Sequence, residues 1–119
     1  MQHVTIRWRP YSDQITEGVI GQLASQIPEI CAPALSVPGG RQYSPSGIVV
    51  KVDQQSHLDI NMPLILIEVF ATGSPEQIKR RHEARAQIIE GIRAHMGDNL
   101  VENDGSVWVL LPETSFGML

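Results

Sequence analysis

The sequence has little of the features that mark specialised classes of protein. It holds one cysteine, Cys31, among 119 residues, so no disulfide can form within the chain and nothing indicates an oxidising compartment. Only 18% of the residues are charged while 42% are hydrophobic, a balance that opposes intrinsic disorder. The net charge of −4 opposes a nucleic-acid partner, because such partners favour a basic surface. The composition therefore predicts one domain with its own hydrophobic core, and Cys31 is expected to be a buried part of it.

No segment is suited to a membrane or to secretion. The longest apolar run, residues 62–67, is far too short to span a bilayer. The first residues lack the charged region and apolar run of a signal peptide, so we expect a cytoplasmic protein without a membrane partner. The sequence also lacks paired metal ligands, a phosphate-binding glycine loop and a Ser-His-Asp arrangement. We therefore expect no metal and no cofactor.

The clearest structural signal lies in residues 62–97. An apolar run predicts a buried strand over residues 64–70, and the helix that follows, residues 75–96, is expected to begin after Ser74. Ser74 can cap the free amides, and Gln77, three residues on, can bond back to it. Gly97 suits the end of the helix. His82 lies beside the apolar stripe of this helix, where we expect it to be packed and hydrogen-bonded.

A weaker copy of the same pattern opens the chain. Residues 3–8 alternate apolar and polar side chains, which predicts a half-buried strand. A helix over residues 13–27 should follow and end at Pro28, because proline lacks an amide hydrogen and restricts the residue before it. Residues 31–47 are expected to form a long loop, and residues 48–52 a second strand.

The last strand should cover residues 107–111. Asn103-Asp104-Gly105 predicts a tight turn that joins it to a short strand near residues 100–101. The apolar tail, residues 112–119, is expected to dock on a neighbouring molecule.

Together these elements predict an α+β domain with the order β-α-β-β-α-β. Repeat one covers residues 1–60 and repeat two residues 61–119 of a single domain, 1–119. Right-handed crossovers then place both helices on one face of a four-stranded sheet. The opposite face keeps valine, isoleucine and leucine side chains, so we expect other copies of the protein to cover it.

Two motifs carry a resemblance to a known family. Pro63-Leu-Ile-Leu-Ile-Glu-Val, followed by Thr-Gly-Ser-Pro-Glu-Gln-Ile-Lys, resembles the opening of a short tautomerase, and Val107-Trp-Val-Leu-Leu-Pro-Glu-Thr resembles its second strand and trailing segment. The chain is thus similar to the tautomerase superfamily, which includes macrophage migration inhibitory factor. The resemblance implies two β-α-β units per chain and a homotrimer whose sheets enclose a central barrel.

The resemblance also implies an amino-terminal proline as the catalytic base, and the sequence departs from it there. Gln2 follows Met1, and a bulky second residue disfavours removal of Met1. Pro63 matches the motif but is internal, so its nitrogen is an amide without a basic lone pair. The α-amino group of Met1, which titrates at about pH 8, could substitute weakly for the prolyl amine.

A small-acid pocket near the amino terminus is also implied by the resemblance. The family often places a cationic side chain there, and Arg41 is the best match in position, with Lys51 second. Arg7 is a further cation on the polar face of the first strand, and Tyr43 could form part of the wall. Arginine suits a carboxylate because its donors form a planar fork.

Three functions are compatible with these residues. The chain could be a tautomerase acting on a small keto or enol acid, with the Met1 amine or a pocket carboxylate as base. It could instead be a trimeric binding protein that keeps the pocket with its catalysis weak or lost. The third possibility is a ferredoxin-like domain, without enzymatic activity, that binds a small molecule or serves in an assembly.

Overall fold

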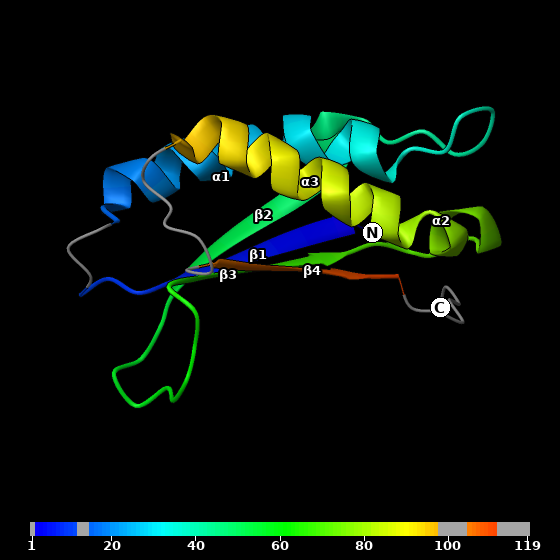
Figure 1. Cartoon of the computed structure of the whole chain (residues 1–119). Helices are drawn as coiled ribbons and strands as arrows, with labels where there is room; N and C mark the ends of the chain where they lie inside the picture. The colour runs from blue at the N-terminus through cyan, green and yellow to red at the C-terminus, as the bar shows by residue number, and fades with distance from the viewer. Residues whose placement is uncertain (1, 12–14, 98–104, 112–119) are drawn as a thin grey trace, which may run out of the picture.

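Two β-α-β units build the protein around one sheet (Figure 1). The computed structural model describes residues 2–11, 15–97 and 105–111. The strands within these residues are β1 (Gln2–Trp8), β2 (Ile48–Gln54), β3 (Ile65–Phe70) and β4 (Gly105–Leu110). The helices are α1 (Glu17–Leu35), α2 (Pro75–Lys79), α3 (Arg81–Met96) and the short 3-10 helix η1 (Pro45–Gly47). The predicted segments 100–101, 103–104 and 112–119 lie outside the described residues, as do Met1 and residues 12–14.

The strand order is β2-β1-β3-β4. β1 runs parallel to β2 and β3 parallel to β4, whereas β1 and β3 pair antiparallel in the centre. Each parallel pair is joined through a helical segment, and these helices cover one face of the sheet (Figure 1). This confirms the predicted α+β class and β-α-β-β-α-β order. It also separates the chain from the ferredoxin-like fold, in which another strand splits the β-α-β unit.

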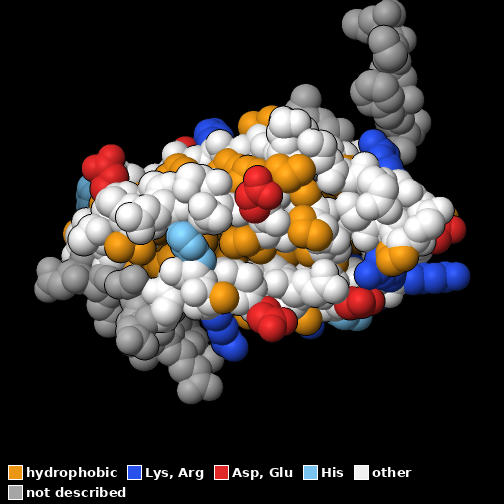
Figure 2. All heavy atoms as spheres, turned by 90° about the horizontal axis from the view of Figure 1, so that it is seen from above, with side chains coloured by type: hydrophobic (Ala, Val, Ile, Leu, Met, Phe, Trp, Pro, Cys, Tyr) orange, Lys and Arg blue, Asp and Glu red, His pale blue; other side chains and the backbone are white. Residues whose placement is uncertain are grey.

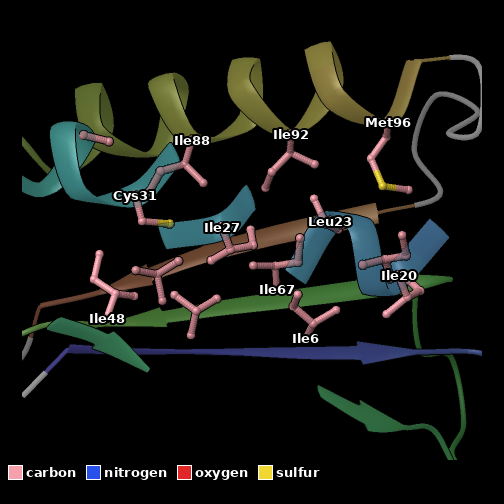
Figure 3. Packing of buried hydrophobic residues seen from close by; sticks show 14 of the residues in the cluster. Ile6, Ile20, Leu23, Ile27, Cys31, Ile48, Ile67, Ile88, Ile92 and Met96 are labelled. Carbon is pink, nitrogen blue, oxygen red and sulfur yellow. The ribbon is translucent and has the colours of Figure 1, made fainter. Parts of the chain in front are cut away.

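The core lies between the sheet and the helices (Figure 3). The strands contribute every second side chain, as the alternation in residues 3–8 predicts, and the helices contribute one apolar stripe each. The most deeply buried of these side chains include Val4, Ile6, Ile67 and Val69 from the sheet, Ile20, Leu23, Ile27 and Cys31 from α1, and Ile88 from α3.

Helix α1 departs from the prediction at both ends. It begins after Thr16, whose Oγ1 accepts a hydrogen bond from the Val19 amide at 3.3 Å, and not at residue 13. It continues through Pro28 and Pro33, so the helix end predicted at Pro28 is wrong, as is the loop start at residue 31. An interior proline costs about 3 kcal/mol, so the part of α1 beyond Pro28 depends on tertiary packing. The buried side chains that continue the apolar stripe past Pro28 are Cys31, Ala32, Ala34 and Leu35.

The second helical segment starts as predicted but is interrupted. Ser74 Oγ accepts from the Gln77 amide at 3.2 Å and Gln77 Oε1 accepts from the Ser74 amide at 2.8 Å, which confirms the capping box. A break at Arg80, whose backbone has φ −95° and ψ 8°, divides the expected single helix into α2 and α3, and the Arg80 guanidinium donates to the Ser36 carbonyl at 2.9 Å. His82 is exposed, so the expectation that it is packed is wrong.

The face of the sheet away from the helices, which we call the open face, has no buried side chain among the described residues. The register places on it the alternate residues His3, Thr5, Arg7, Val49, Lys51, Asp53, Leu66, Glu68, Phe70, Ser106, Trp108 and Leu110. Trp108 is 59% exposed and Val49 54% exposed. The open face is therefore less apolar than the sequence suggested, but large apolar side chains remain uncovered on it.

Within the described ranges, no helix is long and apolar enough to cross a membrane.

Candidate functional site

Two of the predicted site residues belong to segments that meet at the end of the sheet where β1 begins. Gln2 lies opposite Ile48, the first residue of β2, and His3 lies opposite Phe70, the last residue of β3. The segment that leads into β2 and the segment that leaves β3 therefore meet at this end. Arg41 belongs to the first of these segments, as does Tyr43.

Tyr43 ties the two segments together. Its hydroxyl donates to the Thr72 carbonyl at 3.4 Å and accepts a short hydrogen bond from Gln77 Nε2. Its backbone amide donates to Ser36 Oγ at 2.9 Å. The ring is half-buried, so one part is held in the structure while another part stays accessible to solvent.

Gln77 is the residue of this site that the sequence did not reveal. It is buried, and all of its amide atoms have partners, since Nε2 also donates to the Leu35 carbonyl at 3.3 Å while Oε1 accepts from Ser74. The capping motif identified the local bond to Ser74. The bond to Tyr43 joins residues 34 positions apart and leaves no local signal.

Arg41 is held beside Tyr43 and is exposed. Its guanidinium carbon lies 5.2 Å from the centroid of the Tyr43 ring, within the range of a cation–π contact. Its backbone carbonyl accepts from the Val37 amide at 2.9 Å. In the part of the chain that the structure describes, no carboxylate pairs with Arg41, so its donors face solvent and can receive an anionic ligand.

Arg7 and Lys51 lie elsewhere, on the open face. Arg7 Nη1 is 3.8 Å from Glu68 Oε1, and Lys51 Nζ is 3.7 Å from Asp53 Oδ2. Both pairs are substantially exposed, and such pairs contribute little to stability. Among the described residues, no hydrogen bond or ion pair connects Arg7 or Lys51 to Arg41. Arg41, in the segment before β2, is therefore separate from Arg7 and Lys51 on the open face, and Met1 lies outside the described residues.

Cys31 takes no part in either set of cationic residues. It is fully buried, and this burial raises the pKa of its thiol to about 12, so little reactive thiolate forms near neutral pH. In the described ranges, no cluster of three histidine, cysteine, aspartate or glutamate side chains could hold a metal ion.

A shallow depression lies on the exposed side of α3. Figure 2 shows this side of the molecule, where hydrophobic side chains gather along the middle and charged ones lie mostly toward the edges. The lining side chains all come from α3 and are Arg85, Ala86, Ile89, Glu90, Arg93 and Ala94. Because one helix provides the whole lining, the depression has no second wall to enclose a ligand.

Comparison with solved structures identifies the fold. No family model matches the sequence, and no curated protein matches it. The chain is similar to Pt0534 inactivated by 2-oxo-3-pentynoate, with 17% identity and a TM-score of 0.62 over 98% of this chain and 90% of that one. It is also similar to a fused 4-OT solved as an asymmetric trimer, with 10% identity and a TM-score of 0.62 over 98% and 91% of the two chains.

A third similar structure is a macrophage migration inhibitory factor-like protein from Entamoeba histolytica. The identity is 14% and the TM-score 0.57, with 96% of this chain and 89% of that chain covered. The 4-OT proteins and macrophage migration inhibitory factor are members of the tautomerase superfamily. The chain therefore has the tautomerase-superfamily fold, as its motifs suggested. At these identities the likeness concerns the fold alone.

Proposed function

We propose that this chain is a tautomerase-like protein that assembles as a homotrimer and binds a small carboxylate beside the start of β1, with its catalysis weak or lost. The observation that carries this proposal is the position of Arg41, which rests against the anchored Tyr43 ring without a carboxylate partner among the described residues. An exposed guanidinium presented by a fixed ring is a suitable receptor for a planar acid.

The ligand proposed here is a small 2-keto or enol acid. Arg41 would bind the carboxylate through its fork of donors, and the accessible part of Tyr43 would lie against the rest of the molecule. Pt0534, which has the same fold, is inactivated by 2-oxo-3-pentynoate, a compound of this class. Lys51 and Arg7 are the second choice for the carboxylate, because each already has an acidic neighbour.

We infer weak or lost catalysis from the residues at the start of β1. The strand begins with Gln2, and Met1 precedes it, so no prolyl amine stands at this position. Pro63 cannot replace it, because it precedes β3 at the opposite end of the sheet, where Trp8 pairs with Ile65. The α-amino group of Met1 is the remaining candidate base, and a less effective one.

The trimer is supported by the open face and by the fused 4-OT of the same fold, which was solved as a trimer. Exposed Trp108 and Val49 leave apolar area on the open face that neighbouring subunits can cover. A closed assembly of three copies would cover this area in every subunit.

The test compares Arg41→Ala with a matched control, Arg85→Ala, which removes an exposed arginine from α3. Binding of phenylpyruvate to each protein is measured by calorimetry, and turnover of its enol by absorbance. We expect Arg41→Ala to weaken binding at least about tenfold, and Arg85→Ala to leave it unchanged. Equal affinities for the two variants, or no binding to the wild type, would overturn the carboxylate site.

A further inference from the structure

Two large aliphatic side chains stand almost fully exposed in the loop between β2 and β3. Leu58 is 74% exposed and Ile60 81% exposed, more than any other large hydrophobic side chain in the described residues. We call this loop, residues 55–64, the arm, and Leu58 and Ile60 its tip. A single exposed leucine needs no explanation, but two such side chains at one loop tip suggest a contact with a partner.

The base of the arm is firmly attached to the end of β1. Arg9 Nη2 donates to the Met62 carbonyl at 2.6 Å. Gln55 is buried, and its Nε2 donates to the Pro63 carbonyl at 2.7 Å while its backbone amide donates to the Trp8 carbonyl at 2.8 Å. Both ends of the arm are thus held by hydrogen bonds to the core of the sheet.

The turn that carries the tip is also ordered by its own side chains. Asp59 Oδ2 accepts from the Ser56 amide at 2.9 Å, and Ser56 Oγ accepts from the Leu58 amide at 3.1 Å. The Tyr11 hydroxyl donates to the Ser56 carbonyl at 3.0 Å. Asn61 takes a φ of 60°, a left-handed conformation that asparagine tolerates. A turn constrained in this way presents its tip with little ordering entropy left to lose on binding.

The arm projects from the side of the sheet that the helices leave uncovered (Figure 1). The open face lies on the same side, with Trp108 and Val49 largely exposed. Since both the tip and these side chains are exposed, the arm does not fold back to cover the open face of its own chain. One side of the molecule therefore carries an apolar projection and an uncovered, partly apolar surface.

We infer that the arm is an intersubunit contact, in which Leu58 and Ile60 pack on the open face of a second copy of this chain. The inference rests on the homotrimer proposed above and names the residues that hold it together. Every copy carries both a tip and an open face, so rotational symmetry lets each tip meet the face of the next copy and leaves none unused. The charges of the open face are paired within the chain, Arg7 with Glu68 and Lys51 with Asp53. Asp59 lies between the two tip side chains, and its carboxylate accepts from the Ser56 amide of the same turn, so packing of Leu58 and Ile60 leaves no charged side chain without a partner.

The test is the double variant Leu58→Ser/Ile60→Ser, with His57→Ser as a control that alters an exposed polar side chain of the same arm. Dissociation of the oligomer is followed by analytical ultracentrifugation and native mass spectrometry over a range of concentrations. We expect the double variant to weaken assembly at least about tenfold and the control to change it less than about twofold. Circular dichroism checks that each variant is folded. We expect both to fold, because Leu58 and Ile60 are largely exposed and contribute little to the core.

Quenching of tryptophan fluorescence by acrylamide gives a second measurement, because Trp108 is exposed on the open face whereas Trp8 is buried. Assembly should protect Trp108, and the double variant should lose that protection at a concentration where the wild type keeps it. A wild-type trimer that the double variant leaves unchanged would overturn this inference alone. A wild-type monomer at every concentration would overturn the trimer as well, and would indicate a different protein as the occupant.

Discussion

The close contact between α1 and α3 predicts how a substitution at Gly91 changes the free energy of unfolding. Gly91 lies in α3, and a Cβ added there would lie 2.8 Å from Cγ2 of Ile30 and 3.3 Å from its Cγ1. Favourable contacts between carbon atoms lie at about 3.5–4.0 Å, so the added methyl group would be roughly 0.7 Å too close. Ile30 is β-branched and sits in a helix, where one χ1 rotamer dominates, so its methyl group cannot easily move aside.

Two opposing terms decide the effect of Gly91→Ala on the free energy of unfolding. Alanine is favoured over glycine in a helix by about 1 kcal/mol. Overpacking of a close interface costs about 1–3 kcal/mol. The steric term should prevail, so we expect Gly91→Ala to lower the free energy of unfolding by about 1 kcal/mol.

The matched control is Gly21→Ala in α1, since a Cβ at Gly21 meets no atom within 4 Å. This variant should gain most of the propensity term, about 0.5–1 kcal/mol. Urea unfolding followed by circular dichroism, with all proteins at one concentration because assembly contributes to stability, gives both values.

Ile30→Ala completes a double-mutant cycle, because it removes Cγ1 and Cγ2 and leaves only Cβ, at 3.5 Å from the added atom. In that background Gly91→Ala should become stabilising, as Gly21→Ala is in the wild type. If Gly91→Ala stabilises the wild-type protein as much as Gly21→Ala does, the reasoning from this contact is refuted.

Three further predictions concern the core and the site. Burial raises the pKa of Cys31 from 9.0 to about 12, so between these values the unfolded state releases the thiol proton while the folded state keeps it, and the free energy of unfolding falls as the pH rises. From pH 8 to pH 10 this thiol should lower the free energy of unfolding by about 1.4 kcal/mol, and urea unfolding of Cys31→Ala should lack this contribution. Gln77→Leu removes one of the two hydrogen bonds of the Tyr43 hydroxyl and leaves the Ser74 amide and the Leu35 carbonyl without the partner that Gln77 provides, so thermal unfolding should show a loss of about 1–3 kcal/mol in the free energy of unfolding, and an unchanged midpoint would contradict the role given to this side chain. Gln2→Pro should raise turnover of the phenylpyruvate enol at least about tenfold once mass spectrometry shows that Met1 is removed, and an unchanged rate with a free prolyl amine would count against a retained pocket.

Several elements could be predicted because their signals are local. The alternation in residues 3–8 and the apolar run in residues 64–70 located two strands, and Ser74 with Gln77 located a helix start. Each of these patterns acts through neighbours no more than a few residues apart, so the amino-acid order alone reveals it.

Where the predictions failed, a distant contact outweighed a local rule. Pro28 should end a helix by its own chemistry, yet α1 continues because the side chains after it are buried against the sheet. The break at Arg80 accompanies a hydrogen bond to Ser36, 44 positions earlier in the chain. No pattern in either segment carries information about the other.

The candidate site likewise has one part that the sequence predicted and one part that only the structure revealed. Arg41 and Tyr43 stood out in the sequence by residue type and by their position before a predicted strand, but the bond from Gln77 that orients Tyr43 was invisible there. Hydrophobic period and capping chemistry were sufficient to place most of the helices and strands, because both act within a few residues. The strand order, the uncovered face and the tyrosine junction arose only when segments far apart in the chain came together, since their energies depend on three-dimensional proximity that no local pattern records.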